Sequence, residues 1–264
     1  MKLHSIALIM FVSLLVSNCS RPDIKEFAVT ASDGTRYHCK VVVPLMNYVR
    51  VRPLTPANQL KGEVEVPPTV YYDKTRFVVT QIASGAFAGY TGITKVKIPS
   101  TISVIESKAF SGCSAMGEIN TPQPLSTLGD YAFENCSSLA VFDMQASISS
   151  LGEGCFAGCS SLASIRIPTS LNTIPNKCFK NCSGVDNIYI SSTVNAIGAE
   201  AFSGCTGVTR MTSAAGMPPA ASGNTFNGID ANIPVTVPMG GLSYYQSAEG
   251  WKHFNSYTGS YDIK

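Results

Sequence analysis

Apolar residues recur through the middle of this chain with a fixed period of 23 residues. The period is clearest at six phenylalanines, which are Phe87, Phe110, Phe133, Phe156, Phe179 and Phe202. A unit of this length is too short for a domain and too long for one helix or strand. It predicts one supersecondary unit that is repeated and stacked as a solenoid. Because each unit buries its apolar face against its neighbours, we expect an elongated molecule.

Each repeat contains an apolar-x-x-apolar-x-apolar segment, of which residues 162–167 and 93–98 are the clearest examples. This alternation predicts a short strand with one face in the core. The expected buried row comprises Val96, Ile119, Phe142, Ile165, Ile188 and Met211. Pro99, Pro122 and Pro168 should end the strand, because proline cannot continue a ladder. A second apolar row follows at Ile105, Leu128, Leu151, Ile174 and Ile197.

A tight turn is expected shortly after each of the six phenylalanines. The residue two positions after each one is Gly or Asn, the types that most readily adopt a left-handed backbone. This predicts that a turn closes a short helical segment. The next position holds Tyr90, Cys113, Cys136, Cys159, Cys182 and Cys205. A Ser or Thr follows every time, which predicts a stacked row of hydroxyls with a structural role.

The repeat, written I-G-x-x-A-F-x-G-C-S-x-L-x-x-I-x-I-P-x-S, resembles the BspA-like subclass of leucine-rich repeats. Many leucine-rich repeats place an asparagine after the strand, whereas this chain has Pro-x-Ser/Thr. The resemblance covers roughly residues 62–257. It implies an α/β solenoid, a leucine-rich-repeat stack of about six 23-residue coils. It also implies a bacterial surface or secreted protein, often adhesive, without identifying a ligand.

Both ends of the chain depart from the repeat, as the ends of a solenoid must. We divide the chain into a lipoprotein signal peptide at 1–18, a linker and N-terminal β cap at 19–78, leucine-rich repeats at 79–217 and a C-terminal cap at 218–264.

The N-terminal cap is expected to be a small antiparallel β unit between residues 27 and 78. Residues 35–43 alternate strongly and predict one strand, with Tyr37 and Cys39 on its inner face. Residues 64–66 imitate the repeat strand, and Asp73 with Lys74 predicts a hairpin turn.

The C-terminal cap is expected to combine a strand and a helix. Residues 233–238 predict a last strand. Ser243 with Gln246 resembles a capping box that opens a helix. The predicted apolar face of that helix comprises Tyr244, Ala248, Trp251 and Phe254.

The first residues have the pattern of an export signal. Lys2 precedes an apolar run at residues 6–16, which is too short to span a bilayer and suits a secretory signal. The signal ends Val-Ser-Asn-Cys, which resembles a bacterial lipobox with Cys19 as the acylated residue. Ser20 fits outer-membrane retention in such signals. We therefore expect an outer membrane or cell surface lipoprotein of a Gram-negative bacterium, held in the membrane by its acyl anchor.

Composition limits the classes of partner and of chemistry. The formal net charge is +2 and no basic stripe with interleaved aromatics is present, so we expect no nucleic-acid partner. The repeat cysteines permit two interpretations, either disulfides between neighbouring coils or small buried hydrophobes, and parallel side chains in one core slot favour the second. His38 and His253 lie in opposite caps, so we expect no metal site.

No catalytic motif is visible in the sequence. His38 and Cys39 are adjacent, but on a strand they face opposite ways and do not form a nucleophile–base pair. The sequence has no Gly-rich phosphate loop, no paired-carboxylate motif and no recognisable catalytic-triad order of Ser, His and Asp residues. We expect a non-catalytic protein that needs no cofactor.

The outward positions of the stacked strands form the predicted binding surface, because every repeat contributes to it in register. We name it the strand ribbon, and its predicted binding residues are Lys95, Lys97, Glu118, Asn120, Asp143, Arg166, Asn187, Tyr189 and Arg210. We expect Tyr189 and the neighbouring Arg166 to contribute most of the binding energy.

Two functions remain open at this point. One is a lipid-anchored adhesin or binding module, a monomer with a protein or glycan ligand. The other is a periplasmic or cell-envelope structural scaffold.

Overall fold

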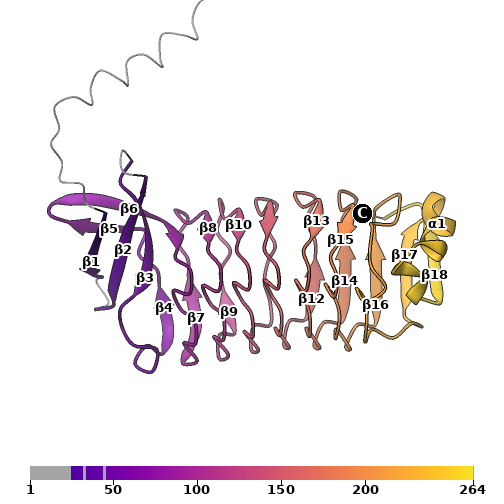
Figure 1. Cartoon of the computed structure of the whole chain (residues 1–264), viewed down its shortest axis with the longest axis horizontal. Helices are drawn as coiled ribbons and strands as arrows, with labels where there is room; N and C mark the ends of the chain where they lie inside the picture. Colours follow the sequence, from indigo (N-terminus) through magenta and orange to yellow (C-terminus); the bar gives the residue numbers. More distant parts are fainter. Residues whose placement is uncertain (1–24, 32–33, 44–45, 264) are drawn as a thin grey trace, which may run out of the picture.

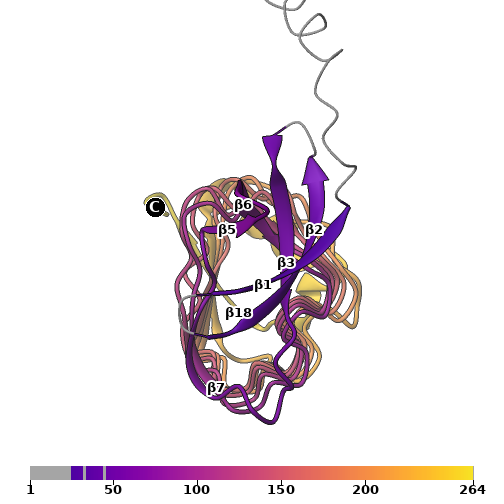
Figure 2. The ribbon, with the colours of Figure 1, turned by 90° about the vertical axis from the view of Figure 1, so that its left-hand side faces the viewer.

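The protein is an elongated solenoid whose coils stack side by side along one axis (Figure 1). The computed structural model describes residues 25–31, 34–43 and 46–263. The predicted signal peptide and Cys19 lie outside these residues. Viewed along the axis, successive coils superimpose around one shared interior (Figure 2). The expected repeat stack is therefore confirmed, with little helix among the described residues.

The repeat strands predicted from the first apolar row form one side of the solenoid as two parallel sheets. The first sheet contains β4 (Gly62–Glu65), β7 (Ile93–Lys97) and β9 (Glu118–Ile119). The second contains β12 (Ser164–Arg166), β14 (Asn187–Ile190), β16 (Arg210–Ser213), β17 (Pro234–Pro238) and β18 (Ser256–Ser260). The predicted row from Val96 to Met211 is buried throughout.

The second apolar row forms another side of the solenoid, with two-residue strands. These are β8 (Val104–Ile105), β10 (Thr127–Leu128), β11 (Ser150–Leu151), β13 (Thr173–Ile174) and β15 (Ala196–Ile197). In each strand one residue points inward, so the row from Ile105 to Ile197 is buried as expected.

The segment around each phenylalanine is a series of turns, which corrects the expected short helix. Backbone N–H groups alternate between two kinds of acceptor. The N–H of Phe87 donates to Ala109 O in the next coil at 2.7 Å, while that of Ala88 donates to Gly85 O at 3.1 Å. Two residues in each coil have a left-handed backbone conformation, as do Lys177 (φ 55°) and Asn181 (φ 60°). They maintain the alternation between the two kinds of acceptor. No helix forms here because half of its donors bond to a neighbouring coil.

The centre of the core is a stack of phenylalanine rings. The six rings of the repeat lie nearly parallel, with neighbouring centroids 5.1–5.6 Å apart. Phe226 extends the stack by one ring beyond the 23-residue repeat, at 5.9 Å from Phe202. Trp251 and Phe254 then pack against Phe226 and close the stack.

The hydroxyl row after the turn is also present. The Ser137 hydroxyl donates to Ser114 O at 3.3 Å, and the Ser160 hydroxyl donates to Ser137 O at 3.4 Å. These bonds join neighbouring coils, which agrees with the structural role expected for the row.

The N-terminal cap begins with β1 (Glu26–Thr30), β2 (Arg36–Val43) and β3 (Tyr48–Pro53), which pair antiparallel. A hairpin of β5 (Thr69–Tyr72) and β6 (Thr75–Ile82) follows, and the residues between these two strands, Asp73 and Lys74, have φ values of 45° and 61°. The predicted hairpin is thus confirmed. β3 pairs parallel with β6 and β6 with β8, so the cap continues the sheet of the second apolar row.

The C-terminal cap differs from the sequence expectation in its helix. α1 spans Leu242–Ser247, its N-cap is Gly241, and no side chain caps it. The predicted capping box is therefore wrong, because Ser243 lies inside the first turn. Tyr245 is the buried aromatic of this helix, whereas Tyr244 is about half exposed (51%).

Two short 3-10 segments complete this end of the molecule, Met239–Gly241 and Trp251–His253. Trp251 is fully buried, and its indole N–H donates to Pro219 O at 2.8 Å.

Candidate functional site

The strand ribbon is present on the outer face of the repeat strands, but it is not continuous. Residues 139–143 form no strand, so the ribbon divides into the β4-β7-β9 sheet and the longer β12-β14-β16-β17-β18 sheet. The interruption coincides with Phe142, whose ring contacts the stacked rings of Phe133 and Phe156 and is larger than the Val, Ile or Met of the other coils. Asp143 lies in this gap, where its carboxylate accepts a hydrogen bond from the Gln145 side chain.

Ion pairs across neighbouring strands dominate the shorter part of the ribbon. Lys95 Nζ lies 2.5 Å from a Glu118 carboxylate oxygen, and Lys97 pairs with Glu63 of β4. The hydrogen bond from Lys97 lowers the pKa of Glu63, and the same bond raises the pKa of Lys97. The two lysines therefore have carboxylate partners within the protein.

Asn120 contributes to the backbone ladder. Its amide group donates to Ile98 O at 2.8 Å, and its carbonyl oxygen accepts from Ile98 N at 2.6 Å. These two bonds extend the pairing of β7 and β9 by one position, so the contacts that the structure shows for Asn120 are with the backbone.

The longer part of the ribbon contains Arg166 and Tyr189, the two residues expected to contribute most of the binding energy. Arg166 and Tyr189 are register partners on β12 and β14, and the Arg166 guanidinium carbon lies 4.1 Å from the centroid of the Tyr189 ring. Such stacking fixes both side chains while their polar edges remain available. Arg210 is one strand further along, where it pairs with Asp186 at 3.3 Å.

Asn187 is the remaining predicted ribbon residue. It lies between Ser164 and Arg210 in the sheet register. Its Oδ1 atom is buried and has no hydrogen-bond partner in the part of the chain that the structure describes. The structure thus brings Arg166, Asn187, Tyr189 and Arg210 together on one sheet, and separates them from Lys95, Lys97, Glu118 and Asn120 by the gap at Asp143.

The comparison with family models decides which repeat this is. The model described as the BspA type leucine rich repeat region matches six copies within residues 80–209. Residues 80–209 belong to the BspA-type leucine-rich-repeat family. Proteins built from such repeats are typically non-catalytic. No curated protein sequence is similar to the chain.

Among solved structures, one agrees with the fold of the BspA-type repeats, and two others are less similar. A leucine-rich cell surface protein from Faecalibacterium prausnitzii A2-165 is 20% identical, with a TM-score of 0.58 over 82% of this chain and 72% of that one. A leucine-rich repeat protein from Treponema pallidum is 22% identical, with a TM-score of 0.48 over 71% of this chain and 90% of that one. A third, from Bacteroides ovatus, is 18% identical, with a TM-score of 0.46 over 89% and 75%.

The cysteine row of the BspA-type repeats is buried and chemically unreactive. Each thiol donates a hydrogen bond to the backbone oxygen of a phenylalanine in the preceding coil, as from Cys136 Sγ to Phe110 O at 3.2 Å and from Cys182 Sγ to Phe156 O at 3.1 Å. Burial raises the pKa of Cys113 and of Cys205 to about 12 and that of Cys159 well above its usual value. A thiol in this state is not a nucleophile at neutral pH, and these contacts support the interpretation as small buried hydrophobes.

Neither a cluster of metal ligands nor a membrane-spanning helix occurs in the described residues. No group of three or more His, Cys, Asp or Glu side chains in those residues could hold a metal ion. Within the same part of the chain, no helix is long and apolar enough to cross a membrane.

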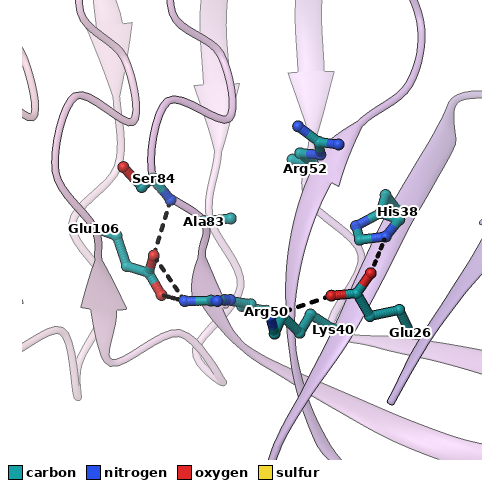
Figure 3. Close-up of a pocket in the computed structure, with 8 residues that line it drawn as sticks. All are labelled: Glu26, His38, Lys40, Arg50, Arg52, Ala83, Ser84 and Glu106. Atoms are coloured by element: carbon teal, nitrogen blue, oxygen red, sulfur yellow. Dashed lines mark hydrogen bonds and ion pairs between the residues drawn. The ribbon is translucent and has the colours of Figure 1, made fainter. Parts of the chain in front are cut away.

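The sequence reading missed a pocket of about 300 Å³ in the N-terminal cap (Figure 3). Its charged lining comprises Glu26, His38, Lys40, Arg50, Arg52 and Glu106. A sequence signal for it exists, because basic residues occupy every second position in 36–40 and in 50–52. The expected inner face of the first of these strands carries Tyr37 and Cys39, and the basic residues lie on its outer face.

Proposed function

We propose that this protein is an exported, lipid-anchored, non-catalytic binding protein of the bacterial cell surface, which holds a protein or glycan partner on its strand ribbon. The observation that carries this proposal is the Arg166–Tyr189 stack on an exposed parallel sheet. Tyr and Arg are enriched among residues that dominate binding energy. The two side chains are already ordered before binding, which lowers the entropy lost on association.

Because the ribbon is interrupted, we assign the binding site to the longer of its two sheets. Lys95, Lys97 and Glu118 are engaged in ion pairs with one another or with Glu63. An incoming partner would have to replace these pairs before it gained new ones. Arg166 pairs with no carboxylate among the described residues, since its contact is with the Tyr189 ring. We therefore place the centre of the site on β12, β14 and β16.

Two further points support placement on the cell surface. The fold is shared with a solved Faecalibacterium prausnitzii protein that is described as a leucine-rich cell surface protein. The end of the signal at Cys19 resembles a lipobox. Protease treatment of intact cells tests the placement: cleavage supports an exposed protein, and protection that is lost on outer-membrane permeabilisation supports the periplasmic scaffold instead.

The binding site is tested by the double substitution Arg166→Ala with Tyr189→Ala. Once a ligand is identified by screening protein and glycan arrays, the double variant should lose at least ~2 kcal/mol of binding free energy, measured by calorimetry. Its melting temperature should stay close to that of the unsubstituted protein, because neither residue belongs to the buried core.

A matched control is available in the N-terminal cap, where Tyr71 and Arg76 are cross-strand partners on β5 and β6 and both are exposed. Tyr71→Ala with Arg76→Ala removes the same two residue types away from the ribbon and should leave the affinity unchanged. Equal losses in both double variants, or no loss in the ribbon variant, would remove the site from the strand ribbon.

The mixed charge of the ribbon gives a second criterion for the partner. Both basic and acidic residues occur along the ribbon, in the order Lys95, Lys97, Glu118, Asp143, Arg166 and Arg210, so a partner of mixed charge fits better than a polyanion. Binding should then weaken only modestly with added salt. A steep linear loss of log affinity with log salt concentration would indicate a polyanion and contradict this assignment.

A further inference from the structure

The pocket in the N-terminal cap lies outside the strand ribbon and has a charge arrangement of its own (Figure 3). It is formed on the outer face of β1, β2 and β3 and is closed on one side by the first turns of the solenoid, at Ala83, Ser84 and Glu106. Its volume is about 300 Å³, which is at the lower end of the range for small-molecule sites.

Strand register brings the basic residues of this pocket together. In the antiparallel pairing of β2 and β3, His38 is opposite Arg52 and Lys40 is opposite Arg50. Directly opposed side chains on one face of a sheet lie within contact distance. The neighbouring residues on the same strands, which are Tyr37, Cys39, Val49 and Val51, are fully buried in the core, so the basic residues all face outward.

The two carboxylates of the pocket are already engaged. Glu26 contacts His38 Nε2 at 3.3 Å and Lys40 Nζ at 3.2 Å. Glu106 accepts from Arg50 Nη1 at 2.8 and 3.1 Å, and from the Ser84 backbone N–H at 2.9 Å. These contacts order the Lys40 and Arg50 side chains from opposite sides of the pocket.

Arg52 is the basic group left over. Three basic residues, Lys40, Arg50 and Arg52, line the pocket beside only two carboxylates, so one of them has no acidic counterpart in the lining. No hydrogen bond or ion pair of the Arg52 side chain occurs within the described residues, and the side chain is exposed. Its guanidinium lies beside His38 in the view of Figure 3.

We propose that this pocket binds a phosphate group, with Arg52 as its principal ligand. A guanidinium presents a rigid fork of donors that matches two oxygens of a phosphate. The third oxygen of a tetrahedral phosphate points out of the guanidinium plane and needs a further donor, and His38, which is opposite Arg52 in the strand register, lines the same pocket. A carboxylate has no third oxygen for a second donor, which is why phosphate is favoured.

The volume of the pocket exceeds that of a phosphate ion, so it accommodates part of the group to which the phosphate is attached. A phosphate monoester of this size occurs in sugar phosphates and in lipid head groups. Both present the same chemistry to Arg52, and the experiment separates them.

The test is calorimetric titration of the purified exported protein at low ionic strength with three probes, namely inorganic phosphate, a hexose phosphate and a soluble short-chain phosphatidic acid. Each should bind at one site. Arg52→Ala should weaken binding of all three by about tenfold or more. Arg52→Lys keeps the charge without the fork and should recover only part of the affinity.

The control substitution is Arg76→Ala, which removes one exposed positive charge from the same cap at a residue outside the pocket. It should change phosphate affinity by less than about twofold, because Arg76 does not line the pocket and does not contact a group bound there. Whichever of the sugar and lipid probes gains affinity over inorganic phosphate, and loses that gain in Arg52→Ala, identifies the source.

Three outcomes would overturn the proposal. One is the absence of saturable binding of any of the three probes. Another is equal weakening by Arg52→Ala and Arg76→Ala, which would indicate a general charge effect. The third is acetate binding as tightly as phosphate, which would make the pocket a carboxylate site. Thermal unfolding of each variant, compared with the unsubstituted protein, shows whether lost binding reflects lost folding.

Discussion

At the scale of single residues, the repeated positions of this protein have repeated environments. Phe156 is fully buried and its ring lies between those of Phe133 and Phe179, at centroid distances of 5.3 and 5.5 Å. Phe142 adds an edge contact at 4.8 Å. Tyr189, in contrast, belongs to the partly exposed ribbon and contacts Arg166 through its ring face. The two aromatic residues should therefore differ greatly in their effect on folding.

Phe156→Ala should lower the free energy of unfolding by about 3–5 kcal/mol, because it opens a cavity in the middle of the ring stack. Tyr189→Ala should cost less than ~1 kcal/mol, since it removes a surface contact only. Chemical denaturation with a common m-value measures both. Equal losses at the two positions would contradict the assignment of Phe156 to the core and of Tyr189 to the surface.

Because of the buried thiols, the free energy of unfolding should fall at alkaline pH. Burial raises the pKa of Cys39, Cys113 and Cys205 to about 12, and that of Cys155 and Cys178 well above the usual value. Below a pH of about 8.5 the thiols are protonated in both the folded and the unfolded chain. Above it the unfolded chain loses protons that the folded chain keeps, so stability falls as pH rises.

Each such thiol should reduce the free energy of unfolding by about 1.4 kcal/mol per pH unit above pH ~8.5. The variant with Cys155→Ala and Cys178→Ala should lose stability less steeply, by the contribution of two thiols. Alanine occupies the same slot at Ala109 and Ala132 and is fully buried there, so the substitution suits the core. Urea melts between pH 7.5 and 9.5 measure the slopes, and mass spectrometry of the native protein checks that the thiols are reduced. Identical slopes in the two proteins would show that these thiols do not carry the effect.

At the scale of the structural element, contacts between neighbouring coils hold this fold together. Backbone donors of the turns bond to the next coil, the thiols bond to the preceding one, and the ring stack runs through all of them. This requires coils to approach closely at certain positions. At Gly152 a Cβ atom would overlap the backbone of Gly129 and Asp130 in the preceding coil.

Gly152→Ala should therefore separate two coils and lower the free energy of unfolding by about 1–3 kcal/mol through overpacking. Gly117 is the matched control, because a Cβ atom there has only an ordinary contact at 3.7 Å with Ser138 O. Gly117→Ala should change stability by less than ~0.5 kcal/mol, or increase it slightly. Thermal melts of the two variants decide the matter, and a Gly152→Ala protein as stable as Gly117→Ala would show that the coils adjust freely.

At the scale of the whole molecule, the protein is a linear stack with a different closure at each end. Antiparallel strands and a hairpin cover the first coil, and Trp251 with Phe254 covers the last ring. None of the helices in the described part of the chain is long and apolar enough to cross a membrane. We propose that attachment to a membrane depends on acylation of Cys19, which lies outside the described residues.

Cys19→Ala should release the protein from the membrane fraction of the cells that produce it. The physical reason is that multiple acyl chains anchor stably, whereas the described chain offers no apolar span in their place. Fractionation with a salt wash, followed by immunodetection, measures the release. Cys113→Ala, a substitution within the solenoid, serves as the control and should remain in the membrane fraction. Retention of the Cys19→Ala protein, with no acylated N-terminal peptide in the native protein, would refute the lipoprotein assignment.

The sequence by itself determined the features that repeat. The period of 23 residues placed Phe87 to Phe202 in one stack, and the alternation in each copy placed Val96 to Met211 in the core. The hairpin at Asp73 and Lys74 was also predictable, since its turn residues are local. Each of these follows from residues close together in the chain, or from the same residue type that meets its own copy one coil away.

Only the tertiary structure decided the features that depend on partners from other parts of the chain. The segment around each phenylalanine is not helical because half of its N–H groups bond to the next coil, which local propensity does not reveal. The division of the ribbon at Asp143 is visible only in the pairing of the strands, since residues 139–143 form no strand.

The pocket in the cap has the same origin, since it joins β1, β2 and β3 to Glu106, which is 56 residues beyond Arg50. Charges on separate strands become a site only when sheet register and coil stacking bring them within a few ångströms of one another. That geometry is set by the packing of the whole solenoid, and local patterns in the sequence do not reveal it.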